Sequence, residues 1–228
     1  MIDALLLSVD DPQLPEGLAA IKNQTVPFGK LIHLNNVAPE NRAFNEGMQM
    51  VDAEWVMYIG GDMILDKDAV ELITTYMKAH SGENISGYYF GLWDSFLECK
   101  VGYIGVLRSS IYKKVKFQNS MTDDGDVVRD LRSKGWVTQK LLDFIVGTHC
   151  HDPNDLQVFR RCYVHGVRFN GNRSIKGRLI ELLKETGNPL YQLGIDAIEF
   201  ARIKKYYPGA HDVNFDKQNF EEFKIWNQ

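Results

Sequence analysis

A single acidic residue, Asp62, ends an apolar segment and is a candidate ligand of a divalent metal. Trp55–Ile59 is a run of large apolar residues, and Gly60 and Gly61 separate it from Asp62. Such a run predicts a buried strand that ends in a tight turn. Ligands bind at the carboxyl ends of strands in open α/β sheets, so a carboxylate there, beside glycines that permit close approach, suits a metal carrying a nucleotide diphosphate. The alternative is a solvated Asp in a turn that ends the strand.

A cluster of three carboxylates, Asp123, Asp124 and Asp126, is a second candidate for chemistry. Val127 and Leu131 follow at helical spacing, which predicts that the cluster lies at the N-terminus of a helix. The helix dipole there keeps an Asp ionised, and an ionised carboxylate can act as a general base toward a hydroxyl. The alternative is helix capping, although capping does not require three carboxylates.

His149 and His151 form the third candidate, because they follow an apolar segment (141–146) and precede Asp152 and Pro153. If the segment stays extended, alternation puts both imidazoles on one face, where they could bind a metal. The alternative is a hydrogen-bonded histidine in a loop that turns at the proline. A dedicated zinc site is disfavoured, because the sequence shows neither the cysteine spacing nor a fourth ligand.

The short apolar run Leu5–Val9 predicts a first strand and Lys30–Leu34 a second, both of which precede the Trp55–Ile59 strand. A helix-like segment ends near Gln24, and a second helix is predicted to end near Val51. The order strand–helix–strand–helix–strand favours an α/β fold with a mainly parallel sheet and helices on both faces.

The composition favours a compact protein that does not bind nucleic acid. The 228 residues carry a net charge of −4, which gives no basic footprint for nucleic acid. No apolar run approaches the roughly 20 residues of a transmembrane helix, and the early first strand argues against a secretory leader. Cys99, Cys150 and Cys162 are odd in number and lack paired spacing, which favours reduced thiols and a cytoplasmic location.

The sequence pattern changes from Arg173 onward. Apolar residues repeat at helical spacing up to a break at Gly187–Pro189, and the repeat resumes over Leu190–Tyr206. This pattern predicts a helical hairpin. The aromatic tail that follows is expected to pack on the body of the protein or on another subunit of a homo-oligomer. We therefore predict two parts, residues 1–170 with the sheet and residues 171–228 with the helices and the tail.

The order and spacing of several motifs resemble the family 2 type of GT-A glycosyltransferases. The motifs that carry the resemblance are residues 8–27, 43–47, 62–65, 102–108, 122–126 and 131–136. Family members usually carry Asp-x-Asp where this chain has Gly60-Gly61-Asp62. Asp62 matches the second Asp, which usually binds the metal directly, whereas Gly60 replaces the first.

The resemblance implies a GT-A, Rossmann-like fold with a C-terminal helical appendage, and an inverting glycosyltransferase of the hexosyltransferase type. Such an enzyme moves a sugar from a nucleotide-diphosphate donor, with UDP or GDP, to a hydroxyl acceptor such as a glycan, assisted by Mn²⁺ or Mg²⁺. Carried over by position, Asp124 is the catalytic base and Asp123 binds the acceptor or shapes the pocket. Many GT-A enzymes add a late histidine to the metal, which points to His149 or His151 beside Asp62.

The resemblance also implies nucleotide-binding residues where the first strands end. Ser8 and Asp10, after the first strand, and Asn36, after the second, are expected to line the base and ribose pocket. Asn45 is expected to support this pocket from the start of a helix. Gly61 is expected to bind the nucleotide together with Asp62.

Trp93–Phe96 is a weaker candidate site. The resemblance places this segment where the family often binds the acceptor, and an aromatic ring there could stack on a sugar face. A tryptophan in the protein core explains the same residues equally well.

Two other classes of function remain open. A nucleotidyltransferase also uses a Rossmann-like half and metal carboxylates, but it usually carries a Gly-rich, basic loop where this chain has Asp10-Asp11-Pro12. A non-catalytic nucleotide-sugar-binding domain is the other alternative, suggested by Gly60.

Overall fold

A computed structural model describes residues 1–118, 123–149, 152–168, 173–206 and 213–227; the side chains at positions 101, 123, 124, 168, 173, 174, 213 and 214 lie outside the description. The described chain forms two units, Met1–His151 and Asp152–Gln228. Each unit buries its own set of apolar side chains.

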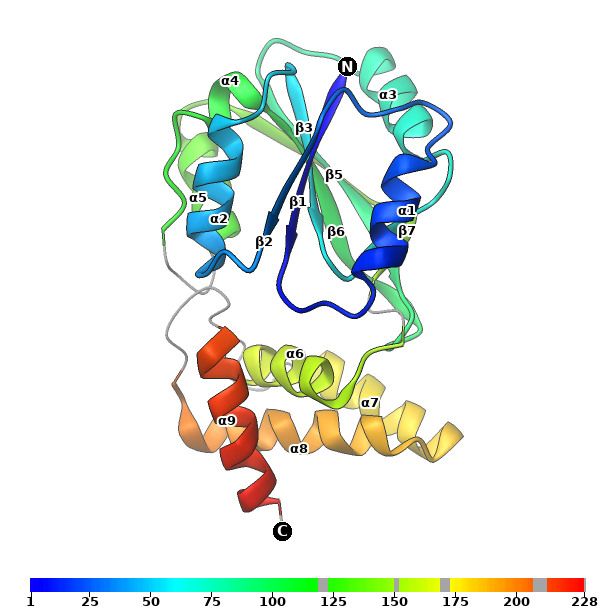
Figure 1. The fold of residues 1–228 in the computed structure, drawn as a ribbon, viewed down its shortest axis with the longest axis vertical. Helices are drawn as coiled ribbons and strands as arrows, with labels where there is room; N and C mark the ends of the chain where they lie inside the picture. The colour runs from blue at the N-terminus through cyan, green and yellow to red at the C-terminus, as the bar shows by residue number, and fades with distance from the viewer. Residues whose placement is uncertain (119–122, 150–151, 169–172, 207–212, 228) are drawn as a thin grey trace. The chain divides into compact units, whose positions relative to one another are not determined.

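The first unit is built on a seven-stranded sheet in the order β2-β1-β3-β6-β5-β7-β4 (Figure 1). The strands are β1 (Ile2–Ser8), β2 (Leu31–Asn35), β3 (Trp55–Gly60), β4 (Met63–Leu65), β5 (Ile85–Asp94), β6 (Cys99–Arg108) and β7 (Val137–His149). β1 pairs in parallel with β2 and β3, and β5 pairs in parallel with β7. The pairings β3–β6, β5–β6 and β4–β7 are antiparallel.

The predicted α/β sheet is confirmed, but among the described strands it is mixed rather than mainly parallel. Its first three strands follow the predicted parallel order, because a helix crosses between each of them. The pairing changes from parallel to antiparallel at residues 95–98, where a short turn joins β5 to β6. A turn of that length can connect only antiparallel neighbours, and Glu98 within it adopts a positive φ of 48°.

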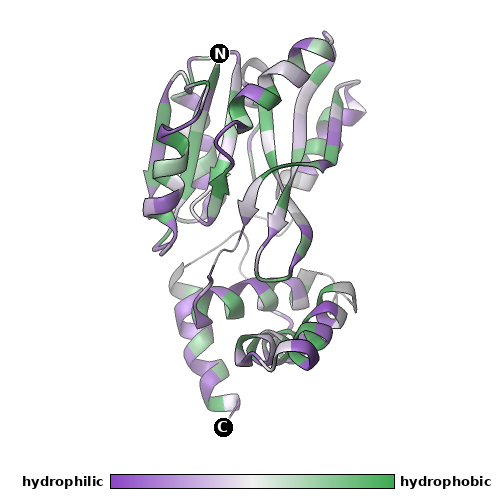
Figure 2. Ribbon diagram, turned by 90° about the vertical axis from the view of Figure 1, so that its right-hand side faces the viewer, coloured by the Kyte–Doolittle hydropathy of each residue, from purple (hydrophilic) through white to green (hydrophobic). Residues whose placement is uncertain are grey.

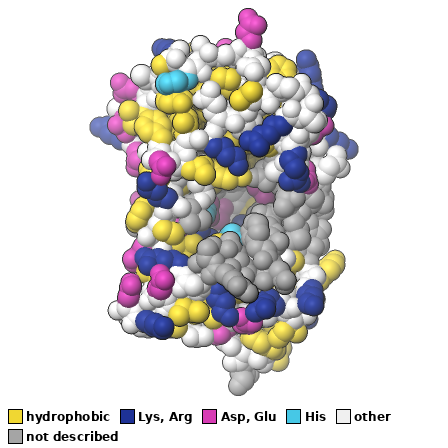
Figure 3. Space-filling view, turned by 180° about the vertical axis from the view of Figure 1, so that it is seen from behind, with side chains coloured by type: hydrophobic (Ala, Val, Ile, Leu, Met, Phe, Trp, Pro, Cys, Tyr) yellow, Lys and Arg dark blue, Asp and Glu magenta, His cyan; other side chains and the backbone are white. Residues whose placement is uncertain are grey.

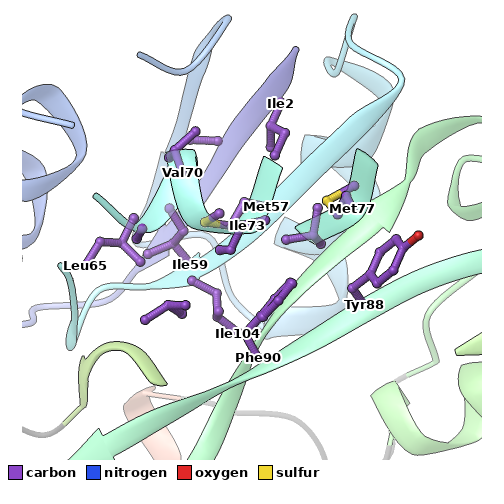
Figure 4. Packing of buried hydrophobic residues seen from close by; sticks show 14 of the residues in the cluster. Ile2, Met57, Ile59, Leu65, Val70, Ile73, Met77, Tyr88, Phe90 and Ile104 are labelled. Atoms are coloured by element: carbon purple, nitrogen blue, oxygen red, sulfur yellow. The ribbon is translucent and has the colours of Figure 1, made fainter. Parts of the chain in front are cut away.

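Helices cover both faces of the sheet, as the sequence predicted (Figure 1). One face packs against α1 (Leu14–Lys22) and α3 (Ala69–Ala79) in the core shown in Figure 4. The other face packs against α2 (Glu40–Gln49), α4 (Ser109–Tyr112) and α5 (Asp123–Ser133). Because both faces are covered, every residue of β1 is buried.

The pairing of β5 with β7 is irregular, and this irregularity positions the candidate site. Phe90 pairs with Leu141, Gly91 with Ile145, and Asp94 with His149. Residues 142–144 therefore bulge out of the pairing. A Cβ at Gly91 would lie 2.0 Å from the backbone oxygen of Leu142, so the bulge requires glycine at this position.

The second unit contains α6 (Asp155–Arg168), α7 (Arg173–Thr186), α8 (Pro189–Lys204) and α9 (Val213–Trp226). The predicted hairpin is α7 and α8. Gly187 turns the chain with a φ of 67°, and the Asn188 side chain then accepts a hydrogen bond from the Leu190 N–H at the start of α8. Hydrophilic and hydrophobic residues alternate along these helices in Figure 2, as amphipathic helices require.

The boundary between the units lies at His151/Asp152, earlier than the predicted boundary at residues 170 and 171. The reason is α6, whose Phe159 lies 6.3 Å from Phe200 of α8 and 4.9 Å from Phe223 of α9, centroid to centroid. Phe223 belongs to the aromatic tail, which is helical and packs within the second unit.

Two observations concern membrane-spanning segments and surface charge. None of the helices that the structure describes has the length and hydropathy to cross a membrane. On the face of the molecule shown in Figure 3, described Lys and Arg side chains are interspersed with Asp and Glu.

Candidate functional site

Asp62 lies in the turn that joins β3 to β4. Gly61 carries this turn past the end of β1, where a Cβ would lie 2.2 Å from Asp11 Oδ2 and 2.8 Å from Ser8 Cβ. Asp11 is fixed there because its Oδ2 accepts a hydrogen bond of 2.9 Å from the Val9 N–H. Gly61 is therefore required by the fold, whatever else it binds.

Three side chains meet beside this turn, and the sheet brings them together. β4 pairs Met63 with His149, and β5 pairs Asp94 with the same histidine. His149 Nε2 lies 3.2 Å from Asp62 Oδ2, and His149 Nδ1 lies 3.0 Å from Asp94 Oδ2. We call Asp62, Asp94 and His149 the metal edge, after the role that the sequence predicts for Asp62 and His149.

The donor atoms at the metal edge fit Mn²⁺ or Mg²⁺. Asp62 offers a carboxylate oxygen and His149 an imidazole nitrogen, both of which bind Mn²⁺. Two ligands about 2.1 Å from one octahedral ion lie about 3 Å apart, close to the observed separation of 3.2 Å. No three His, Cys, Asp or Glu side chains in the described ranges form a metal-holding group by themselves.

Met63 occupies the space beside Gly60, the position where the family usually carries its first carboxylate. The Gly60 N–H donates to Met63 Sδ over 3.2 Å. A Cβ at Gly60 would lie 3.0 Å from Asp62 Oδ1 and 3.4 Å from Met63 Cε. The packing of Met63 and Asp62 beside Gly60 therefore leaves little room for the carboxylate that the family usually carries at this position.

Ser8 lies in a polar network where β1 and β2 end, and we call Ser8, His33 and Asn35 the nucleotide edge, after the role that the sequence predicts for Ser8. Ser8 is 2% exposed. Its Oγ donates to Asn35 Oδ1 over 2.9 Å and lies 2.8 Å from His33 Nε2. Because the hydroxyl gives its proton to Asn35, it accepts from the His33 Nε2–H. Desolvation lowers the pKa of His33, which favours the neutral ring. The sequence analysis missed His33 and Asn35, although both are polar residues on a half-buried strand.

Asp10 and Asn36, the other predicted pocket residues at these strand ends, both adopt a positive φ, of 49° and 57°. Asp and Asn tolerate this conformation better than other non-glycine residues. The Asn36 N–H also donates to the Ser8 carbonyl over 2.9 Å. Their residue types are thus explained by the turns that they form, and a binding role remains a prediction.

Asn45 lies within α2 rather than at its start, and its side chain holds a distant segment. Its Nδ2 donates to the Phe117 carbonyl over 2.9 Å, and its Oδ1 accepts from the Phe117 N–H over 3.0 Å. Asn45 therefore fixes the backbone of the segment that precedes α5. Any support that it gives to the nucleotide pocket acts through that segment.

The predicted helix start at the acidic cluster is confirmed, because α5 begins at Asp123. The side chains of Asp123 and Asp124 lie outside the described part of the structure, so their catalytic roles remain predictions. His151 lies outside the described residues altogether.

Asp94 is the residue of the site that the sequence analysis did not assign. It was singled out only as part of Trp93–Phe96, as an acceptor segment or core. Trp93 is 42% exposed, which excludes the core tryptophan, whereas Asp94 is 0% exposed. The signal that marked Asp62, an acid at the end of a buried strand, was also present here.

No protein-family model and no curated protein matches the sequence. Solved structures do match. The mannosyltransferase PcManGT from Pyrobaculum calidifontis, in complex with GDP-Man and Mn²⁺, has a TM-score of 0.59 at 9% identity, over 90% of this chain and 72% of that chain. TarS from S. aureus has a TM-score of 0.51 at 10% identity, over 80% of this chain and 42% of that chain. This chain therefore spans less than half of that TarS chain.

A shorter TarS structure, residues 1-349 in complex with UDP, has a TM-score of 0.50 at 10% identity, over 100% of this chain and 92% of that chain. Such low identities carry information about the fold alone, and these structures agree with one another on it. The protein has the GT-A fold of the nucleotide-sugar transferases.

Proposed function

We propose that this protein is an inverting glycosyltransferase, which moves a sugar from a nucleotide-diphosphate donor to a hydroxyl acceptor with the help of Mn²⁺ or Mg²⁺. The observation that carries the proposal is the separation of 3.2 Å between Asp62 and His149 at an edge of a GT-A sheet. These two side chains supply a carboxylate and an imidazole to one small volume. When bound, the metal would offset the charge of the departing diphosphate.

The donor nucleotide would bind where β1 and β2 end, beside the turn that carries Asp62. Gly61 lies next to Ser8, which joins the nucleotide edge to the metal edge. Support for a UDP or GDP donor comes from the structural neighbours, which hold GDP-Man or UDP in their complexes.

Asp124 would be the catalytic base. It lies in the first turn of α5, where the helix dipole favours the ionised carboxylate. In an inverting transfer this carboxylate takes the proton of the acceptor hydroxyl as the hydroxyl oxygen attacks the anomeric carbon. The bond from that carbon to the diphosphate oxygen breaks, and its electron pair leaves with the diphosphate.

A second candidate function, a non-catalytic nucleotide-sugar-binding domain, is favoured by the Met63 side chain beside Gly60. With one carboxylate in the motif, metal would be held less firmly by the protein. A nucleotidyltransferase is the less favoured third candidate, since the loop after β1 lacks a Gly-rich, basic character.

Isothermal titration of the protein with UDP, GDP, UTP and GTP, each with and without Mn²⁺, separates these candidates. The proposal expects one nucleoside diphosphate to bind in a Mn²⁺-dependent manner. A preference for a triphosphate would favour nucleotidyl transfer, and diphosphate binding that ignores Mn²⁺ would favour the non-catalytic domain. A protein that binds none of the four contradicts all three.

A further inference from the structure

Asp94 is a buried carboxylate whose two oxygens accept hydrogen bonds from different partners. Its Oδ1 accepts from the Leu97 N–H over 2.7 Å, within the turn that follows β5. Its Oδ2 lies 3.0 Å from His149 Nδ1. The side chain of Asp94 is 0% exposed, so water does not compete for these oxygens.

The two carboxylates beside His149 differ in exposure, and the difference places the ring proton. The Asp62 side chain is 27% exposed and can be hydrated, whereas Asp94 cannot. A buried carboxylate that lost its donor would bear the full cost of desolvation. In a neutral ring the proton therefore stays on Nδ1, bonded to Asp94, and Nε2 presents its lone pair toward Asp62.

We propose that Asp94 is a positioning residue, which holds His149 in the Nδ1–H tautomer with its Nε2 lone pair directed at the metal edge. A histidine binds a metal through the nitrogen that carries no proton, and the hydrogen bond of the other nitrogen decides which one that is. The value of this tautomer to the protein rests on the metal role proposed for His149. The tautomer itself is argued from the hydrogen bonds of Asp94 and not from the metal.

The substitution Asp94→Asn would reverse the tautomer with almost no change in shape. The Leu97 N–H requires an acceptor, so the amide oxygen of the new side chain stays on Leu97. The amide NH₂ then faces His149 Nδ1 and donates to it. The ring must take the Nε2–H form, which blocks its metal-binding lone pair.

The first test reads the tautomer without any metal. Two-bond ¹H–¹⁵N correlation spectra of ¹⁵N-histidine-labelled, metal-free protein, at a pH where the ring is neutral, should place the proton of His149 on Nδ1. Asp94→Asn should move it to Nε2. Asp3→Asn is the matched control, because Asp3 is also a buried carboxylate in the same sheet and accepts from the Asp52 and Ala53 N–H groups.

The second test measures Mn²⁺ affinity by electron paramagnetic resonance, with UDP or GDP present. Asp94→Asn should weaken Mn²⁺ binding by about 10–100-fold, as loss of a group that orients a metal ligand does. Asp3→Asn should leave it unchanged. In a His149→Ala background Asp94→Asn should have no further effect, since it acts through the imidazole.

The outcomes keep this inference apart from the proposed function. A parent spectrum with the proton on Nε2, or a variant spectrum that keeps it on Nδ1, overturns the positioning role whatever the metal does. A reversed tautomer with unchanged Mn²⁺ affinity supports the hydrogen bond and contradicts the metal role of His149. If Asp94→Asn fails to fold, the parent spectrum still decides the tautomer.

Discussion

Two histidines lie near strand ends of the same sheet, and their partners set them apart. At the nucleotide edge, His33 Nε2 meets the Ser8 hydroxyl, which donates to Asn35 and therefore accepts from the His33 N–H. At the metal edge, His149 Nδ1 meets the Asp94 carboxylate, which accepts. Ser8 and Asp94 are both buried, so each histidine meets a partner that water does not reach.

The two edges differ in which ring nitrogen carries the proton. The Ser8 hydroxyl gives its one proton to Asn35, so His33 carries its proton on Nε2 and donates it to Ser8. In the tautomer proposed above, His149 carries its proton on Nδ1 and presents the Nε2 lone pair that a metal ligand needs. The same residue type in the same fold thus holds its proton on different nitrogens, and the buried partner decides which.

The largest effect is expected on turnover, at Asp124. This residue belongs to neither edge, so its substitution distinguishes catalysis from donor binding. Asp124→Asn should lower turnover by roughly 10²–10⁴-fold, the usual contribution of a positioned base, and change donor affinity only a few-fold. Turnover and donor affinity measured on the same preparation check this. Asp123→Asn is the control, with its main effect expected on the KM for the acceptor. Turnover near that of the parent would remove Asp124 from the mechanism.

Substitution of one histidine at a time tests the contrast between His149 and His33. His149→Ala should weaken Mn²⁺ binding by at least about 10-fold and reduce the preference for Mn²⁺ over Mg²⁺, because imidazole nitrogen favours Mn²⁺. His33→Ala should leave Mn²⁺ affinity as in the parent. Electron paramagnetic resonance titrations with both variants check the pair. An equal loss of Mn²⁺ affinity in both variants, or no loss in either, would contradict the distinction between the two edges.

Removal of the Ser8 hydroxyl should act on stability instead of metal binding. Ser8→Ala loses the hydrogen bond to Asn35 and the contact with His33, and we expect a cost of about 1 kcal/mol in the free energy of unfolding. Thermal unfolding and Mn²⁺ titration of the same variant measure both quantities. Weaker Mn²⁺ binding at unchanged stability would show that the edges are coupled.

The smallest effect is expected on the pH dependence of the free energy of unfolding. Desolvation lowers the pKa of His33 below the unfolded value of about 6.5, so between the two values the unfolded state binds more protons. The free energy of unfolding should therefore fall as the pH drops from about 6.5 through the folded pKa, and His33→Gln should remove that part of the fall. Urea unfolding at about pH 7.5 and about pH 5.5 checks the sign. The same slope in both proteins would assign it to other groups.

Local features of the fold and site were predictable from the sequence, whereas the register in which β5 pairs with β7 was not. Asp62 after a buried strand and the helix start at Asp123 are patterns of neighbouring residues. The contact between Asp94 and His149 depends on the bulge at residues 142–144 and on a further shift of register between Gly91 and Trp93. From the pair Phe90–Leu141, a regular register would place Asp94 opposite Ile145. No local pattern signals that shift.

Long-range packing limited the sequence analysis in the same way. The hydrogen bonds of Asn45 reach Phe117, 72 positions along the chain, whereas the resemblance to the family had suggested a role in the nucleotide pocket. The predicted boundary near residue 170 followed the break before the hairpin. The structure groups α6 with the second unit because Phe159 packs on Phe200 and Phe223. These partners become neighbours only in the folded chain.

The central claim is that Asp62 anchors a metal-dependent nucleotide site, and one titration tests it. Isothermal titration of Asp62→Ala with the preferred nucleoside diphosphate, with and without Mn²⁺, should show no Mn²⁺-dependent binding. The variant should unfold at the temperature of the parent, because a carboxylate in a turn contributes little to the core. Asp68→Ala, an exposed acid six positions further on, should bind as the parent does. A folded Asp62→Ala variant that binds nucleotide and Mn²⁺ like the parent would contradict the account.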